Sequence, residues 1–444
     1  MFPALPRTGG VLRALAIAGT CTLAPALAPA QPAPAALVSP AASPDAPEPR
    51  LTVADLVDAA LRHNPQLQAA RRAREAAAAG VSAARALPNP RLEYGSGQNR
   101  ARFAGGPAGQ VETWGISQLV ENPALRRARL DGAQSARAGS DHQVAAAANE
   151  LEAQVRTRAY EVLLRREEAD AAADALELLE QIRERVRLRV ASGEAARYEV
   201  IKADAEVINA RQKLDSALLQ VEQSMLAINR LAAGALPARW RLAGSLGDPL
   251  EPQPLAVLKA RALSGNPELQ ALQAEVARRE ARVAEARAGR WPGLELRVGQ
   301  ARDPEIRQTT VTASMQLPLL DRRDGAIGEA VAELARARAL YDGRSAELTQ
   351  QLDMAWKALA LARVRVNALA SGALPEAEAA LRVAQAAYRF GERGILDVLD
   401  AQRHLRTVRA DLIDARFQLQ SAGVELEFLA GGYAPGARTD RPLP

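Results

Sequence analysis

The sequence predicts a mainly helical protein with a small β part, built from two copies of one structural unit. The duplication is visible because Ala60–Ala69 returns as Ala262–Ala271, with its Asn-Pro pair in the same place. Further along, Gly193-Glu194 returns as Gly391-Glu392, so the two copies stay almost in step. Long stretches without glycine or proline predict helices, and short stretches that alternate apolar and polar residues predict strands.

The N-terminus predicts export. Two arginines, an apolar run and small residues before Ala30 predict a secretory signal over residues 1–30, cleaved after Ala30. Residues 31–50 are rich in proline and alanine, and we expect them to be flexible. Cys21 is the only cysteine and lies within the signal, where either lipidation or an ordinary place in the signal fits. No later apolar run reaches the ~18 residues that a membrane-spanning helix needs.

Both structural repeats begin alike. We expect the first repeat to cover residues 51–234 and the second residues 254–432, with a linker at 235–253 and a tail at 433–444. Each repeat has an Asn-Pro pair, at Asn64 and Asn266. Asparagine suits the N-cap of a helix and proline its first turn, so a helix should follow each pair. Proline-containing breaks end these helices near Ala86 and Ala288.

One pair of short strands follows the first helix of each repeat. Leu294, Leu296 and Val298 alternate with polar or small residues, and residues 309–317 alternate in the same way. Weaker runs lie at residues 92–95 and 113–117. Each run approaches the ~9–11 residues of a tilted membrane strand, although a soluble hairpin with one wet face also alternates. The alternation predicts lipid contact for three apolar side chains, namely Leu294, Leu296 and Val311.

Very long helices come after the strands. Residues 124–191 and 326–389 should each be helical, with a break in the second near Gly372 to Pro375. Apolar residues at spacings of three and four predict a coiled-coil-like seam in the first helix. Glycine turns at Gly193 and Gly391 should end both helices, since glycine adopts the left-handed C-cap without strain. A further helix follows each turn, at residues 197–233 and 396–430.

The strand count has a structural consequence. Four strands cannot close a barrel alone, and in lipid every strand edge must be paired. A homo-oligomer that pools its strands satisfies this requirement, and its pooled helical hairpins would extend the conduit away from the membrane.

Composition excludes several function classes. A formal net charge of +5, spread evenly over 57 basic and 52 acidic residues, does not predict nucleic-acid binding. No metalloprotease, nucleophile-elbow or phosphate-loop motif is present, so we expect no catalytic residue, no cofactor and no enzyme. His63, His142 and His404 are widely separated along the chain, which disfavours a metal site.

The segment from Tyr388 to Ala401, together with the duplication and the Asn-Pro helix starts, resembles TolC-type outer-membrane efflux channels. The resemblance covers nearly all of the exported chain. It implies a homotrimer in the outer membrane, with a twelve-stranded β-barrel on a periplasmic α-barrel, which works with a periplasmic adaptor and an inner-membrane RND-type pump. Residues 86–92 resemble the heavy-metal (CzcC-like) branch, which implies metal cations as substrate. Alternatives are a periplasmic coiled-coil scaffold or adaptor without a pore, and an outer-membrane component of type I protein secretion.

The same resemblance implies roles for residues at the helical tips. Asp397 and Asp400, three residues apart on one helix face, would line the periplasmic entrance, although a solvated face explains the spacing equally. Tyr388, Arg393 and Glu199 would hold a gate closed, with a Glu199–Arg393 ion pair between the hairpins. The turn residues Gly193, Glu194, Gly391 and Glu392 would dock the adaptor.

Overall fold

The computed structural model describes residues 48–100 and 103–435 of the 444-residue chain. The expected signal at 1–30, Cys21, most of the 31–50 segment and the end of the tail lie outside the described residues.

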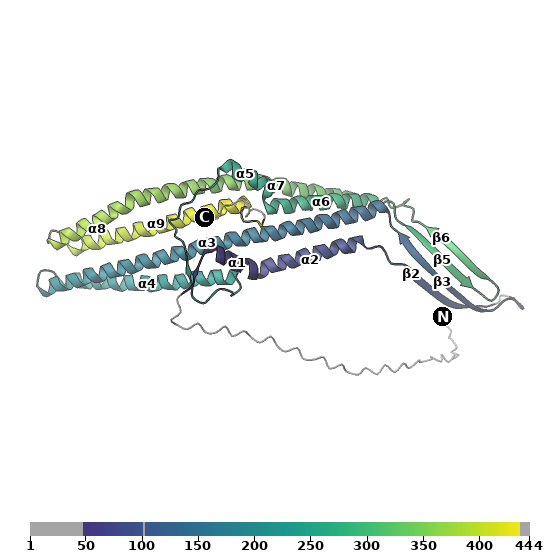
Figure 1. The fold of residues 1–444 in the computed structure, drawn as a ribbon, viewed down its shortest axis with the longest axis horizontal. Coiled ribbons are helices and arrows are strands. Elements are labelled where there is room, and N and C mark those ends of the chain that lie inside the picture. The colour runs from purple at the N-terminus through teal and green to yellow at the C-terminus, as the bar shows by residue number, and fades with distance from the viewer. Residues whose placement is uncertain (1–47, 101–102, 436–444) are drawn as a thin grey trace, which may run out of the picture. The chain divides into compact units, whose positions relative to one another are not determined.

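Each repeat contains a short helix, a second helix, two strands and a helical hairpin (Figure 1). The first repeat comprises α1 (Val53–His63), α2 (Pro65–Arg85), β2 (Arg91–Asn99), β3 (Gly109–Val120), α3 (Pro123–Ala191) and α4 (Arg197–Leu231). The second comprises α5 (Leu255–Gly265), α6 (Pro267–Ala288), β5 (Leu294–Arg302), β6 (Arg307–Ser314), α7 (Asp324–Ala368), α8 (Leu374–Arg389) and α9 (Ile395–Leu429). The predicted helices and strands are therefore confirmed, in the predicted order.

The Asn-Pro pairs begin helices as expected. The Oδ1 atoms of Asn64 and Asn266 each accept two backbone N–H groups of the first turn that follows. Their side-chain amide nitrogens also donate hydrogen bonds to distant residues, which the sequence does not predict. Asn64 Nδ2 donates to the carbonyl of Leu231 at 3.0 Å, and Asn266 Nδ2 donates to that of Leu429 at 3.0 Å. Each asparagine thus connects the start of one helix to the end of the last helix of its own repeat.

A further Asn-Pro pair, Asn122-Pro123, begins α3. Asn122 Oδ1 accepts the N–H of Ala124, and its Nδ2 donates to the carbonyls of Ala288 and Trp291. These bonds join the start of α3 in the first repeat to the segment between α6 and β5 in the second. These hydrogen bonds therefore connect the two repeats at the boundary between the helices and the sheet.

The four longer strands form one antiparallel sheet in the order β2-β3-β5-β6. The central pairing of β3 with β5 crosses between the repeats, so the sheet belongs to both halves. β2 and β6 are its two edges. Figure 1 shows these strands beyond one end of the long helices, whereas the α3–α4 and α8–α9 turns lie at the other end.

The expected break in the second long helix is a π-helical turn. It covers Leu369–Ala373 and lies between α7 and α8, with Pro375 in the first turn of α8. Proline lacks a backbone N–H, and a single π turn accommodates such an interruption without ending the helix.

The segment between the repeats is more ordered than a simple linker. Arg241–Leu242 forms β4, which pairs in parallel with β1 (Arg50–Leu51). Trp240 is only 2% exposed and packs in a core cluster with residues of α1 and α3, such as Leu56 and Val155. This segment therefore packs against the middle of α3.

Alanine and glycine allow the helices to pack closely. α3 contacts α2, α4, α6 and α9, so it is the central helix of the described fold. A Cβ atom added to Gly139 of α3 would lie 3.5 Å from the Cβ of Ala274 on α6. Nearer the turns, Leu179, Ile182 and Val186 of α3 are buried in a cluster with α4, α8 and α9, which confirms the predicted seam.

Candidate functional site

One face of the sheet is apolar across all four strands. Leu92, Ile116, Val298 and Val311 are register partners in succession, so they form one row from edge to edge. The exposed fractions of its large apolar side chains run from 39% for Leu294 to 78% for Val311. The face also carries further large apolar side chains, namely Tyr94, Trp114, Val120 and Leu296. A continuous exposed apolar surface of this kind marks an interaction site for lipid or protein.

The opposite face of the sheet carries mostly polar and small side chains, with Leu119 as an exposed apolar exception. Arg297 of β5 reaches across β3 to form an ion pair with Glu93 of β2. Gly115 lies on the strand between them, where an added Cβ would be 3.5 Å from Arg297 Nε and 3.0 Å from the carbonyl of Val298. Thr310 and other small polar residues continue this face. The sheet therefore has one face suited to lipid and one suited to water.

At the other end of the helices, the two hairpin turns have the same backbone geometry. Gly193 has φ +81° and Gly391 has φ +75°, in the left-handed region that glycine adopts without strain. The N–H of Glu194 bonds to the carbonyl of Arg189, and that of Glu392 bonds to the carbonyl of Ala387, each at 2.9 Å. The predicted glycine turns are confirmed, and the side chains of both glutamates are exposed.

Tyr388 connects the two hairpins at these turns. It lies at the end of α8 and is 8% exposed, and its Oη donates to Glu199 Oε2 on α4 at 3.2 Å. The Arg189 guanidinium of α3 lies 4.6 Å from the centre of the tyrosine ring and donates to the Tyr388 carbonyl at 3.1 Å. Burial raises the pKa of Tyr388, Glu199 adds to the rise and Arg189 opposes it, so the hydroxyl stays a donor. Tyr388 therefore holds α8 against both helices of the other hairpin.

The expected Glu199–Arg393 ion pair is wrong for this structure. Within the described chain, Arg393 pairs with Asp397 at 3.9 Å, and the side chain of Arg393 is 66% exposed. The physical reason is local, because Arg393 lies just before the N-cap Gly394 of α9 and only four residues from Asp397 in the first turn. The hairpins are connected at this level by Tyr388 instead.

Asp397 and Asp400 lie one helical turn apart on α9, with 46% and 70% of their side chains exposed. Neither carboxylate is isolated. Asp397 faces Arg393, and Asp400 accepts a hydrogen bond from Arg403 Nη1 at 2.9 Å. Arg403 also donates to Glu206 of α4. The role of the two aspartates in a pore remains a prediction. The contacts made by Arg189 and Arg403 were not identified from local sequence patterns.

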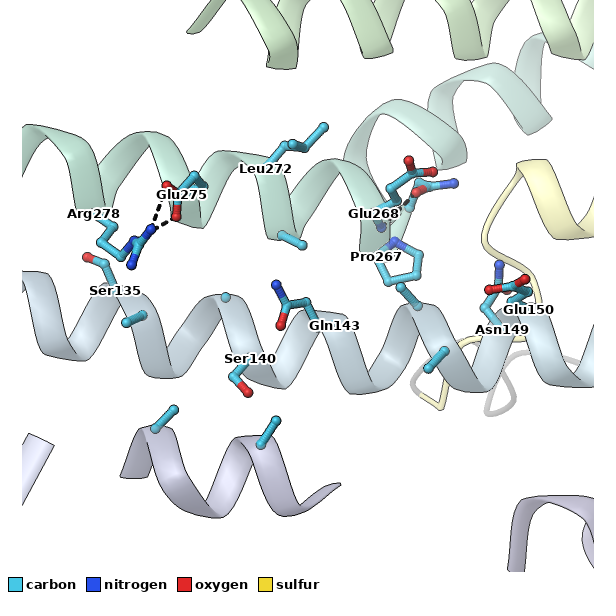
Figure 2. Close-up of a pocket in the computed structure, with 18 of the residues that line it drawn as sticks. Ser135, Ser140, Gln143, Asn149, Glu150, Pro267, Glu268, Leu272, Glu275 and Arg278 are labelled. Atoms are coloured by element: carbon cyan, nitrogen blue, oxygen red, sulfur yellow. Dashed lines mark hydrogen bonds and ion pairs between the residues drawn. The ribbon is translucent and has the colours of Figure 1, made fainter. Parts of the chain in front are cut away.

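A groove of about 860 Å³ runs along α3 between α2 and α6. Figure 2 shows that small side chains line much of it and that polar side chains, such as Gln143 between α3 and α6, lie along its length. Charged lining residues have partners: Glu275 accepts bonds from Arg278, and Glu150 accepts one from Gln154. These charged side chains of the groove are therefore engaged in hydrogen bonds and ion pairs.

In residues 48–100 and 103–435, no three His, Cys, Asp or Glu side chains lie together in a way that would hold a metal ion. None of the helices in the same ranges is both long enough and apolar enough to cross a membrane.

The chain belongs to the outer membrane efflux protein family, whose model matches residues 56–234 and 258–432. The two matched segments coincide with the two structural repeats. The family places the chain in the outer membrane, and it is a channel family.

Known proteins agree with this assignment. The chain is 27% identical over 383 residues to the cobalt-zinc-cadmium resistance protein CzcC of Cupriavidus metallidurans, covering 86% of this chain and 90% of that protein. The fold matches a crystal structure of CusC with a TM-score of 0.75 and 16% identity, over 85% of this chain and 91% of CusC. It also matches a membrane protein from Pseudomonas aeruginosa with a TM-score of 0.74 and 24% identity, over 85% and 90% of the two chains.

Proposed function

We propose that the protein is the passive outer-membrane channel of a tripartite efflux system. Three copies would pool their sheets into a twelve-stranded barrel and their helices into a periplasmic tube. Substrate would pass through this tube from an inner-membrane RND-type pump, which a periplasmic adaptor links to the channel.

The sheet carries this proposal. Its edge strands, β2 and β6, are each paired on one side only within the described chain, and one face carries a continuous row of apolar side chains. In lipid an unpaired strand edge costs several kcal/mol for each unsatisfied backbone group. Pairing β6 of one subunit with β2 of the next removes both edges and leaves Leu294, Leu296 and Val311 facing lipid. The polar face would then surround water.

The helical tips support the periplasmic part of the proposal. The exposed turns with Gly193, Glu194, Gly391 and Glu392 are the parts of the hairpins farthest from the sheet, so they would meet the adaptor (Figure 1). Tyr388, Glu199 and Arg393 would hold the entrance closed. The Tyr388–Glu199 bond supports this role because it joins the two hairpins directly.

Metal cations are the substrate class that we propose. The support is the likeness to CzcC, whose name describes resistance to cobalt, zinc and cadmium. A passive tube requires no high-affinity ligand set, because the pump selects the substrate.

Cell growth and fractionation test the proposal. Deleting the gene should lower the tolerated zinc, cobalt or cadmium concentration, and the parent gene should restore it. The protein should be recovered from outer membranes as a heat-modifiable oligomer. A soluble periplasmic monomer would instead favour a scaffold or adaptor without a pore, and a defect confined to an exported protein would favour a type I secretion component.

A further inference from the structure

Arg403 of α9 contacts carboxylates on two different hairpins. Its Nη1 donates to Asp400 on the same helix at 2.9 Å, and its Nη2 donates to Glu206 on α4. The side chain of Glu206 is only 14% exposed, compared with 70% for Asp400. The guanidinium is therefore held between a shielded partner on the other hairpin and an open partner on its own.

The contact with Glu206 extends the connection made by Tyr388. Glu199 and Glu206 are seven residues apart on α4, which places both on the same side of that helix. Glu199 accepts from Tyr388 and Glu206 accepts from Arg403, so α4 receives two contacts from the α8–α9 hairpin, two helical turns apart. Both contacts must break if the hairpins separate.

The contact with Asp400 behaves differently when the hairpins move. Asp400 and Arg403 are three residues apart on one helix, so their pairing survives movement of α9 as a whole. In the described structure one positive charge is shared by two carboxylates. After separation from Glu206, the same charge would compensate Asp400 alone.

We propose that Arg403 couples the effective charge of Asp400 to the closure of the helical tip. The proposal rests on the proposed channel function and concerns how its entrance is regulated. Arg403 is a positioning residue that holds α9 against α4, and it also sets how strongly the entrance attracts cations. The hydrogen bond to Glu206 is the main reason that the pKa of Arg403 is raised, so its charge is permanent.

Three single substitutions separate the two effects. Arg403→Gln removes both contacts and the charge, so it should raise single-channel conductance and strengthen block by a trivalent cation. Glu206→Gln removes the negative charge of the partner on α4 and so weakens the contact between hairpins, while Arg403 and Asp400 are unchanged. It should raise conductance while block stays equal or weakens. Arg403→Lys keeps the charge but loses the planar guanidinium. Compared with Arg403→Gln, it should return block to the parent's strength, while conductance stays above that of the parent because the contact with Glu206 is only partly restored.

The measurement uses the purified full-length oligomer in planar bilayers at low ionic strength, where surface charges are least screened. Hexaamminecobalt(III) is added on the side of the helical tips, and its apparent blocking constant is determined. Arg403→Gln removes one unit charge about 4 Å from Asp400. The apparent blocking constant of hexaamminecobalt(III) should therefore fall about five-fold. The control is Arg406→Gln, which removes the same charge one turn further along α9 and has no ion pair with a residue of the described chain.

The outcomes are distinct. Equal block and conductance in Arg403→Gln and Arg406→Gln would overturn the inference and leave the channel function standing. Stronger block in Glu206→Gln would also overturn it, because that variant leaves Arg403 entirely to Asp400. If Arg403→Gln fails to assemble, Glu206→Gln and Arg403→Lys carry the test by themselves. A parent protein that forms no channel would overturn the proposed function together with the inference.

Discussion

Replacing Val311 by arginine tests which face of the sheet meets lipid. Val311 lies on the edge strand β6, pairs with Val298 of β5 and is 78% exposed on the apolar face. Thr312 is the next residue and projects from the opposite, polar face. The two substitutions Val311→Arg and Thr312→Arg therefore add the same charge to the same strand on different sides.

The expected free-energy cost of Val311→Arg follows from the position of Val311 in β6. β6 covers Arg307–Ser314, so Val311 is near its middle and about 13 Å along the strand from Arg307, at ~3.3 Å per residue. Near the bilayer midplane an arginine on the lipid face costs roughly 2–4 kcal/mol. A factor of ten corresponds to about 1.4 kcal/mol, so assembly of Val311→Arg should fall to about a tenth of the parent level or less.

The assay is the amount of heat-modifiable oligomer in outer-membrane fractions from cells with matched expression. We expect a severe loss for Val311→Arg and a mild one for Thr312→Arg. Equal tolerance of both substitutions, or a greater loss for Thr312→Arg, would refute the assigned faces of the sheet.

Three further predictions concern the tip and the helix starts. Combining Tyr388→Phe with Arg393→Ser should raise single-channel conductance in planar bilayers, because the hydroxyl contact between hairpins is lost, and unchanged conductance with normal assembly would count against a gate there. Replacing both Asp397 and Asp400 by alanine should abolish block by trivalent cations and weaken cation selectivity; block equal to that of the parent would mean that they form only a solvated face. Asn266→Ala should destabilise the protein by about 2–4 kcal/mol, since it removes an N-cap and leaves the Leu429 carbonyl without its side-chain donor. Its oligomer should dissociate at a lower temperature than the parent, and an unchanged temperature would contradict the assigned double role.

Most of the helices and strands could be predicted from the sequence, because the signals that determine them are local. Asn64 and Asn266 cap helices because the side-chain oxygen reaches N–H groups two and three residues away. Gly193 and Gly391 end helices because their own backbone angles permit it. The alternation along residues 294–298 identified the strands for the same reason, since each of these signals acts within a few residues.

Contacts between distant helices were not predictable in the same way. The bond between Tyr388 and Glu199 joins residues 189 positions apart, and its formation depends on how each helix is rotated. The incorrect Glu199–Arg393 pair shows the difficulty, because Arg393 had a competing carboxylate only four residues away. Trp240 was likewise placed in a loop, although its burial against α3 fixes that loop in the core.

The central claim is that this chain forms an oligomeric channel in the outer membrane. The most direct measurement is the mass of the oligomer purified from outer membranes in detergent, followed by conductance of the same sample in planar bilayers. The account predicts a particle of three chains that conducts ions. A monomer, or a trimer that never conducts even when Tyr388→Phe and Arg393→Ser are combined, would contradict it.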